Sequence, residues 1–243
     1  MYADTLRDKI ILVVGGALGI GRATARLCAT RGAKVIVADV DTTEGQKAAS
    51  ETGGLFIPVN ITEEASVQAM ARQIGETYER LHVLIHTAGI LRGAYTPLDE
   101  FTVETFRGVL DVNVTGMFLC VKHFVPLLKK SGHGVIILTS SGAATSGSSS
   151  LAYGTSKGGV NSFAVTLTTR LDPEGIRVNV LSPGNIDTGM KRSVIAVDTE
   201  KRGLDFMKAV ADMQLGTPEG VAKVLAWLAS DEADYVRGVI STR

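Results

Sequence analysis

The chain has 243 residues, 45% of them hydrophobic and 21% charged, which is enough to build one large domain with a substantial core. Lysine plus arginine (25) equals aspartate plus glutamate (25) and no long block of one charge occurs, so nucleic acid and anionic membrane are not expected partners. The first apolar stretch is too short for a signal peptide or a membrane span. Cys28 and Cys120 lie in apolar helical patterns and are expected to be small buried hydrophobes, so we expect a cytoplasmic protein.

Short apolar runs rich in valine and isoleucine alternate with longer amphipathic stretches along the whole chain. The runs predict strands buried on both faces, at 9–15, 33–39, 54–60, 81–87, 134–140, 176–182 and 237–242. The stretches between them predict helices at about 20–31, 41–51, 63–79, 102–130, 152–170 and 218–230. This alternation predicts a doubly wound α/β fold: one mostly parallel, seven-stranded sheet with helices on both faces, forming a single domain over 1–243.

The first predicted strand runs directly into the glycine-rich segment "GGALGIGRATARL". Gly15 permits a tight turn, Gly19 lets the backbone approach a pyrophosphate, and Gly21 allows close helix packing. The helix that follows offers free N–H groups and its positive dipole end to phosphates. Because this pattern lies between a strand and a helix, it predicts a dinucleotide site.

Asp39 ends the second predicted strand, 18 residues beyond Gly21. A carboxylate here accepts the ribose hydroxyls of NAD and repels the 2′-phosphate of NADP. No arginine or lysine occurs in "ADVDTT" (38–43), and position 18 in the glycine loop is leucine. We therefore expect NAD, with NADP the less favoured cofactor, although Asp39 is also a residue type common in turns that follow strands.

The segment "AYGTSKG" (152–158) places Tyr153 and Lys157 one helical turn apart on the same face. A neighbouring cation lowers the pKa of a tyrosine toward the range useful for acid/base catalysis. The same spacing also occurs on solvated helix faces, where the lysine stem lies along the ring, so the pair alone proves little.

Together these features resemble the short-chain dehydrogenase/reductase family, and the resemblance covers essentially the whole chain. The family's motifs occur in order: the glycine loop at 15–21, Asn60 after the third strand, His86-Thr87-Ala88-Gly89 ending the fourth, Asn113 in the long helix, a serine after the fifth strand, Tyr153 with Lys157, and Pro183-Gly184 after the sixth. The resemblance implies a Rossmann-type fold and an oxidoreductase. It implies cofactor contacts from Gly15, Leu18, Gly19, Ile20, Gly21, Asp39, Asn60, Ile61, Ala88, Gly89, Tyr153, Lys157, Pro183, Gly184, Ile186 and Thr188.

The resemblance also implies the catalytic roles. Tyr153 is expected to be the general acid/base, and Lys157 to hold the nicotinamide ribose and lower the tyrosine pKa. Asn113 is expected to anchor a water in a proton relay from Lys157 to solvent; a helix-interior amide that bonds backbone is compatible with this role. A serine is expected to hold the substrate oxygen.

Two serines compete for that last role. The family spacing of 13 residues before the tyrosine favours Ser140 narrowly, whereas Ser141 aligns better if the loop has lost one residue. The Ser/Gly-rich segment 140–150 is expected to be a loop at the carboxyl edge of the sheet. Expected substrate contacts are Ser140, Ser141, Gly142, Tyr153 and Asn185. The segment at about 189–213 resembles the mobile lid that closes over substrate in the family.

Some positions depart from the family pattern. Val14, His86 and Thr87 replace residues whose side chains tie the loops together, so we expect looser loops and interpret His86 as a strand-end residue bonded to backbone. The histidines form no spaced cluster with other ligands, which predicts no metal site. The family's usual Asp- and Gly-rich tail does not follow "RGVISTR", from which we expect weaker packing at a subunit interface. By analogy, a homodimer or homotetramer paired through 102–130 and 152–170 is still expected.

The leading hypothesis is hydride transfer between NAD(H) and a small secondary alcohol or ketone. One alternative is an NADPH-dependent 3-oxoacyl thioester reductase, which Asp39 and Leu18 oppose. Another is a catalytically silent protein that binds a dinucleotide as a sensor, which has no need of the Ser140, Tyr153, Lys157 and Asn113 set.

Overall fold

In the computed structural model, which describes residues 4–242, seven parallel strands form one sheet in the order β3-β2-β1-β4-β5-β6-β7. The strands are β1 (Ile10–Val14), β2 (Lys34–Asp39), β3 (Leu55–Pro58), β4 (Val83–His86), β5 (Gly134–Thr139), β6 (Ile176–Ser182) and β7 (Gly238–Ser241). Strand order reverses direction between β1 and β4, which opens a crevice beyond their carboxyl ends. Ligands of doubly wound sheets bind in that crevice.

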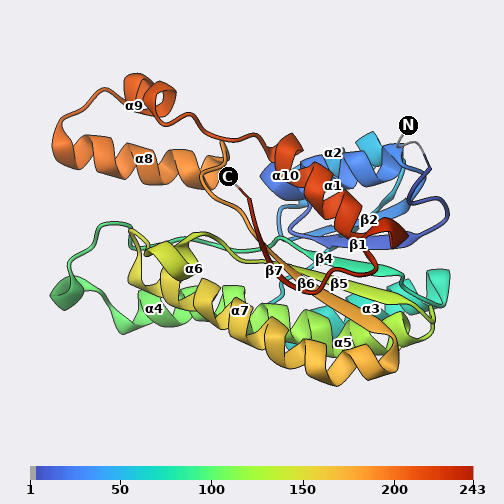
Figure 1. The fold of residues 1–243 in the computed structure, drawn as a ribbon. Helices are drawn as coiled ribbons and strands as arrows, with labels where there is room; N and C mark the ends of the chain where they lie inside the picture. The colour runs from blue at the N-terminus through green and yellow to red at the C-terminus, as the bar shows by residue number, and fades with distance from the viewer. Residues whose placement is uncertain (1–3, 243) are drawn as a thin grey trace.

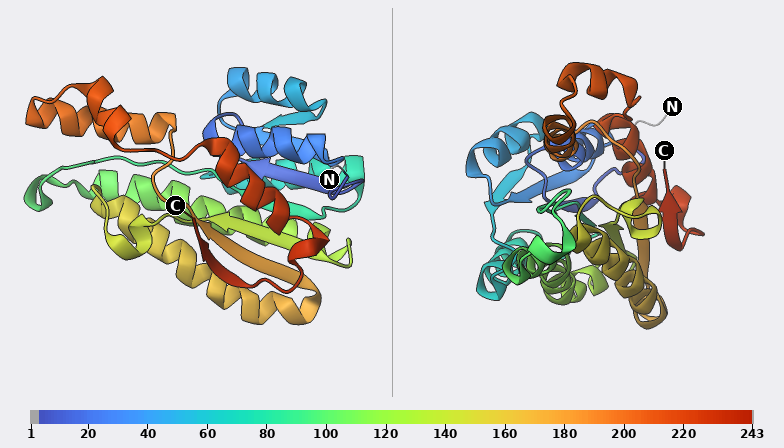
Figure 2. Two further views of the ribbon diagram at one scale, coloured as in Figure 1. Left: turned by 45° about the horizontal axis from the view of Figure 1, so that its top comes forward. Right: turned by 90° about the vertical axis from the view of Figure 1, so that its left-hand side faces the viewer.

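Ten α-helices connect and extend these strands within the described residues. They are α1 (Gly19–Thr30), α2 (Thr42–Thr52), α3 (Glu64–Tyr78), α4 (Val103–Leu110), α5 (Met117–Lys129), α6 (Ala143–Ser146), α7 (Leu151–Leu171), α8 (Gly189–Arg202), α9 (Phe206–Asp212) and α10 (Pro218–Leu228). The views in Figures 1 and 2 show α1, α2 and α10 on one face of the sheet and α3, α5 and α7 on the other.

The strands are apolar along their whole length because each buries both faces. In β1, Ile10, Leu12 and Val14 pack into the core beneath α3, α5 and α7. The alternate residues Ile11 and Val13 pack into the core beneath α1 and α10. A parallel sheet covered on both sides needs this continuous pattern, which is why β1 has no polar alternation.

The predicted doubly wound fold is confirmed, and all seven strands and six predicted helices occur with small boundary shifts. Two local features differ from expectation. The segment 140–150, predicted as a loop, contains the single turn α6. The predicted helix 102–130 is divided into α4 and α5 by a π-helical segment, Asp111–Gly116.

The apolar helical segment Val103–Lys129 is the one described segment long and hydrophobic enough to cross a membrane by length and composition. Many of its apolar side chains instead enter the core under the sheet, where Phe124 and Leu128 are fully buried. Cys28 and Cys120 are likewise buried and unpaired, and burial raises the pKa of each thiol to about 12. Both cysteines are therefore small core residues, as the sequence predicted.

Candidate functional site

The turn between β1 and α1 is built so that the backbone itself forms a cradle. Gly15 and Gly19 have positive φ angles of 80° and 51°, which residues with a side chain rarely adopt. A Cβ added at Gly15 would lie 2.4 Å from the Ala88 nitrogen, and one added at Gly21 would lie 2.0 Å from the Gly15 carbonyl oxygen. α1 begins after Leu18 without a side-chain cap, so its first N–H groups remain available to an anion.

The change Gly21→Ala tests this cradle. Because the new methyl group would collide with backbone, we expect the glycine loop to be pushed out of place and dinucleotide affinity to fall at least about tenfold. Isothermal titration calorimetry with NADH measures the change in Kd. The matched control is Gly189→Ala, since a Cβ at Gly189 meets no atom within 4 Å; unchanged affinity in the Gly21 variant would contradict the role given to this turn.

Asp39 lies at the carboxyl end of β2 beside the glycine loop. Its carboxylate accepts hydrogen bonds from the backbone nitrogens of Ala17 (3.0 Å) and Asp41 (3.1 Å). It therefore shapes the loop, as a turn residue does. A carboxylate offers about four acceptor positions, so two remain for hydroxyl groups of a ligand.

Residues that follow β3 and β4 continue the site along the carboxyl ends of the strands. The Asn60 side chain bonds Thr62 and Glu63 in the turn that precedes α3, and Ile61 is buried against Gly116. The Thr87 hydroxyl donates to the carbonyl oxygens of Val14 (2.9 Å) and Gly15 (3.1 Å). The expected loss of loop-tying bonds is therefore wrong for Thr87, because its hydroxyl holds the loop after β4 to the glycine loop.

The loop after β6 closes over the glycine loop from the other side. Pro183 is buried, and its carbonyl oxygen accepts a hydrogen bond from the Gly142 nitrogen (2.9 Å). Thr188 caps α8 through the Lys191 nitrogen (3.2 Å), and its methyl group lies 3.4 Å from where a Cβ on Gly19 would be. Of the predicted cofactor residues in this loop, Thr188 thus lies next to the cradle, whereas Gly184 is exposed and Ile186 is buried in the core beside α1 and α10.

Tyr153 and Lys157 lie one turn apart on α7, as predicted, with the lysine nitrogen 5.5 Å from the centre of the tyrosine ring. Lys157 is only 4% exposed, and its Nζ donates to the Thr139 carbonyl oxygen at 2.8 Å. Lys157 is thus buried and Tyr153 half-buried, so the pair does not lie on a solvated helix face. Burial lowers the pKa of Lys157 to about 8.

The ionisation of Tyr153 differs from the expectation that its pKa falls. Burial raises the pKa of Tyr153, and a hydrogen bond with the Ser141 side chain acts in the opposite direction. In the protein by itself, desolvation of the phenolate is thus the larger effect.

The two candidate serines point in different directions. The Ser140 hydroxyl is 2% exposed and donates to the Lys157 carbonyl oxygen at 2.9 Å. Ser141 is the residue whose side chain hydrogen-bonds with Tyr153. This geometry differs from the narrow sequence-based preference for Ser140, whose hydroxyl is committed to the helix that carries Tyr153.

Asn113 lies in the π-helical segment, which turns its side chain toward the loop after β4. Its amide oxygen accepts from the Ile90 nitrogen (2.8 Å), and its Nδ2 donates to the Ile90 carbonyl (2.9 Å) and the Ser156 hydroxyl (2.9 Å). The amide is therefore occupied by protein groups. π-Bulges occur frequently at functional sites, and this one joins the long helix to α7 and to the loop that contains Gly89.

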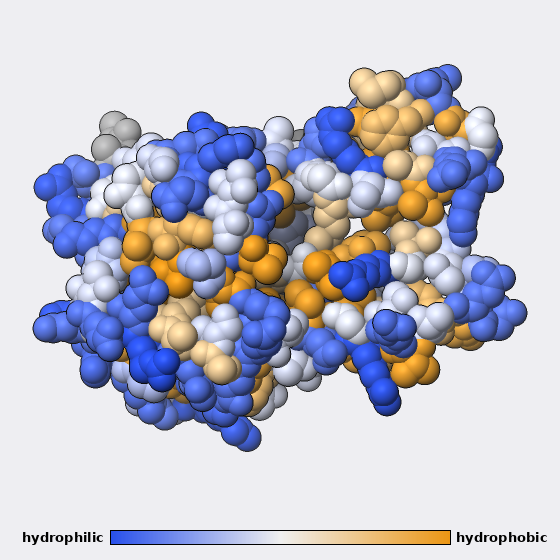
Figure 3. Space-filling model, turned by 180° about the vertical axis from the view of Figure 1, so that it is seen from behind, coloured by the Kyte–Doolittle hydropathy of each residue, from blue (hydrophilic) through white to orange (hydrophobic). Residues whose placement is uncertain are grey.

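The excursion between β6 and α10 stands over these residues. Its two ends are joined by hydrogen bonds of Asp187 and Asn185 with Gly216, both 2.8 Å, and α8 and α9 project beyond the sheet (Figure 1). At its outer end the Lys201 Nζ donates to the Tyr95 carbonyl oxygen at 2.6 Å. Figure 3 shows a hollow between this hairpin and the body of the molecule, with apolar residues along its walls.

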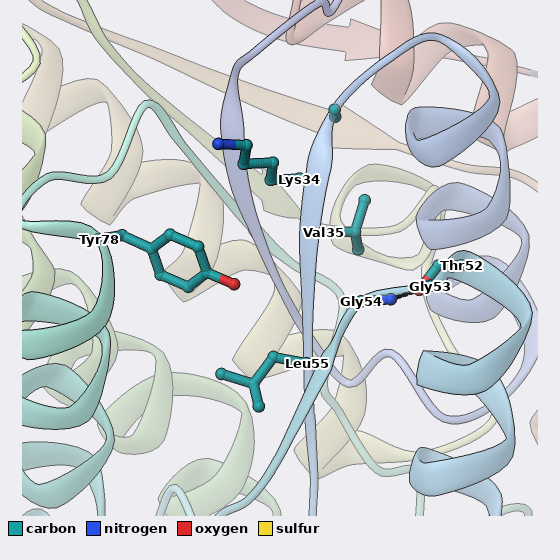
Figure 4. Close-up of a pocket in the computed structure, with 8 residues that line it drawn as sticks. Lys34, Val35, Thr52, Gly53, Gly54, Leu55 and Tyr78 are labelled. Carbon is teal, nitrogen blue, oxygen red and sulfur yellow. Dashed lines mark hydrogen bonds between the residues drawn. The ribbon is translucent and has the colours of Figure 1, made fainter.

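A separate surface depression of about 520 Å³ lies at the opposite edge of the sheet (Figure 4). It is lined by residues at the amino ends of β2 and β3 and by Tyr78 of α3. The depression is remote from Tyr153, and we assign it no role. Among residues 4–242, no three histidine, cysteine, aspartate or glutamate side chains gather as metal ligands.

The sequence left open which of Ser140 and Ser141 is bonded to Tyr153, and the structure gives that contact to Ser141. One feature of the site escaped the sequence altogether. His86 is 2% exposed, and its Nε2 has no hydrogen-bond partner among the described residues, although its ring bonds with its own backbone as predicted. No sequence signal marks such an atom.

Comparison with known proteins places this site in context. The profile of a family described as "Enoyl-(Acyl carrier protein) reductase" matches residues 15–242. "Tropinone reductase-like 2" of Erythroxylum coca is 36% identical, over 96% of this chain and 88% of its own length. "Cis-4-hydroxycyclohexanecarboxylate dehydrogenase" of Sinomonas cyclohexanicum is 34% identical, over 98% of this chain and 95% of its own length. A solved structure titled "Crystal Structure of Levodione Reductase" has a TM-score of 0.89 at 27% identity and covers 97% of this chain and 96% of its own.

Proposed function

The chain belongs to the short-chain dehydrogenase/reductase family, oxidoreductases that act on alcohols and ketones with NAD(P), and within it we propose hydride transfer between NAD(H) and a secondary alcohol or ketone. The observation that carries this proposal is the pair of half-buried Tyr153 and buried Lys157, with Ser141 bonded to Tyr153, at the carboxyl edge of the sheet. A silent dinucleotide sensor needs no such pair.

In the proposed reaction, Tyr153 exchanges a proton with the substrate oxygen. Ser141 donates a hydrogen bond to that oxygen and holds it beside the tyrosine, so we assign to Ser141 the role that the family spacing gave to Ser140. Lys157 places a positive charge near the ring and favours the phenolate. A bound nicotinamide supplies the hydride or accepts it.

The residues present fit a dinucleotide. The cradle of Gly15, Gly19 and Gly21 admits a pyrophosphate where a Cβ would intrude, and α1 directs free N–H groups toward it. Asp39 has acceptor positions left for ribose hydroxyls, and Thr188 faces the cradle. Asn113 acts by fixing the loop that contains Gly89, beside Lys157.

Charge around Asp39 supports NAD over NADP. A 2′-phosphate would face the carboxylate, and the arginine next to the glycine loop, Arg22, is already engaged by Glu44 (2.8 Å) and Glu51 (2.6 Å). These ion pairs hold the guanidinium against α2, where it is occupied.

Fluorescence titration with NADH and NADPH tests this preference. We expect NADH to bind at least about tenfold more tightly, since an unfavourable charge contact of about 1.4 kcal/mol has that effect. The change Asp39→Asn should reduce the ratio of the NADPH Kd to the NADH Kd, because NADPH should bind more tightly. Asp41→Asn is the matched control, because it removes a nearby charge and keeps a good cap for α2; a parent protein that prefers NADPH would contradict the argument.

A second candidate function, reduction of a 3-oxoacyl thioester with NADPH, is favoured by a relative named "3-oxoacyl-[acyl-carrier-protein] reductase FabG" from Escherichia coli (strain K12), which is 33% identical over 95% of this chain and 93% of its own length. Asp39 and the exposed Leu18 oppose it, since neither receives a 2′-phosphate. Screening should begin with hydroxylated cyclohexane rings, because the relative from Sinomonas cyclohexanicum is named for such a substrate.

Two further properties belong to this proposal. The hairpin of α8 and α9 serves as the lid over substrate, and Gly142 and Asn185 line the entrance beneath it. A homodimer or homotetramer forms through α5 and α7. Phe118 and Val165 support this interface because they leave apolar surface exposed on these two helices (45% and 55%), where Phe118 stacks edge-on with Phe163.

A further inference from the structure

His86 ends β4 with a buried acceptor that the proposed chemistry does not use. The side chain is 2% exposed, and Nε2 has no hydrogen-bond partner in the part of the chain that the structure describes. Burying a polar atom without a partner costs free energy, so native proteins rarely do so without a reason.

The imidazole lies on the face of the sheet that α7 covers. Its neighbours in register, Val14 on β1 and Leu138 on β5, belong to the core beneath α3, α5 and α7, and both are apolar. Lys157 enters this region from α7 and is the charged group whose field acts on His86. Tyr153, one turn earlier on α7, is the other titratable group of this site.

Lys157 Nζ has N–H groups left to donate, and His86 Nε2 has no donor among the described residues. The Lys157 ammonium has three N–H groups, and the described structure gives Nζ one hydrogen-bond acceptor, the Thr139 carbonyl oxygen at 2.8 Å. Burial and the Lys157 charge lower the pKa of His86 to about 3. The ring is therefore neutral at working pH, and a neutral imidazole has one nitrogen that accepts.

We propose that His86 Nε2 accepts a hydrogen bond from one buried water, which itself accepts a hydrogen bond from Lys157 Nζ, and that His86 is thereby a positioning residue for the Tyr153–Lys157 pair. The inference rests on the proposed function for its catalytic meaning. A single water with polar partners on two sides is a common way to satisfy buried atoms of this kind. The water bridge stabilises the ammonium form of Lys157 and fixes its position under Tyr153.

Two variants distinguish the effect of losing the hydrogen-bond acceptor from the effect of changing the shape of the side chain. His86→Leu fills the site without an acceptor, whereas His86→Gln keeps one. In the leucine variant, the alkaline limb of the kcat/KM profile is expected to move down by about one pH unit, the size of one lost hydrogen bond to a charge. The reason is that Lys157, without the bridge, would lose its proton at a lower pH than in the parent. The glutamine variant should stay near the parent, and the Kd for NADH should be unchanged in both.

Equal alkaline limbs in the parent and the leucine variant would overturn the proposal. So would equal shifts in the leucine and glutamine variants, because ring shape alone would then explain the effect.

A measurement on the unmodified protein decides the matter independently of activity and of variant folding. A high-resolution crystal structure should contain an ordered water within about 3 Å of both His86 Nε2 and Lys157 Nζ. The imidazole ¹⁵N shifts should show a neutral ring protonated at Nδ1. A dry Nε2, or a ring protonated at Nε2, overturns the inference even if NADH binds as proposed; failure of NADH binding with the water present would instead count against the proposed function.

Discussion

Replacing Tyr153 with phenylalanine is expected to lower kcat for oxidation of a secondary alcohol by about 10²–10⁴-fold, because the change removes the group that exchanges the proton. The ring still packs against Lys157, so the Kd for NADH should stay within about twofold of the parent value. A loss of turnover while NADH still binds would also show that the protein is an enzyme and not a dinucleotide sensor.

Tyr235 provides the matched control for that experiment. Its side chain is fully exposed, at 101% of the reference area, so Tyr235→Phe should leave kcat and NADH affinity unchanged. Activity that survives in the Tyr153 variant would show that the mechanism assigned to this pair is wrong.

The serine variants should produce opposite patterns. Ser141→Ala removes the hydroxyl that bonds with Tyr153, and the loss of one such donor is expected to lower kcat by about 10²–10³-fold with little change in Tm. Ser140→Ala instead removes a second hydrogen bond to the Lys157 carbonyl, beside the one within α7, at a cost of about 1 kcal/mol in the free energy of unfolding.

Thermal unfolding and steady-state kinetics on both variants distinguish the two serines. If the Ser140 variant loses turnover while the Ser141 variant keeps it, the family spacing of 13 residues identifies the catalytic serine after all. Because Ser140 bonds with α7, the helix that carries Tyr153, we also expect a modest loss of activity in the Ser140 variant.

Much of the fold was predictable because it depends on local patterns. Strands such as Ile10–Val14 are apolar on both faces, and helices such as Gly19–Thr30 begin at glycine or capping positions, so each element carries its own signal. Parallel strands joined through helices then allow few topologies, and the order β3-β2-β1-β4-β5-β6-β7 is one of them. The single turn α6 was missed because four residues carry too little pattern.

The sequence by itself determined the cradle and the spacing of the Tyr153–Lys157 pair, since glycine at 15 and 21 and residues four apart on a helix have consequences that follow from local geometry. Only the tertiary structure decided which serine side chain bonds with Tyr153 and that Arg22 is occupied by two carboxylates. It also decided that His86, near Lys157, buries an acceptor with no partner among residues 4–242. The physical reason is that hydrogen-bond partners, burial and the shift of a pKa depend on atoms from distant segments. Those distances are set when the sheet and its helices pack, and no local pattern encodes them.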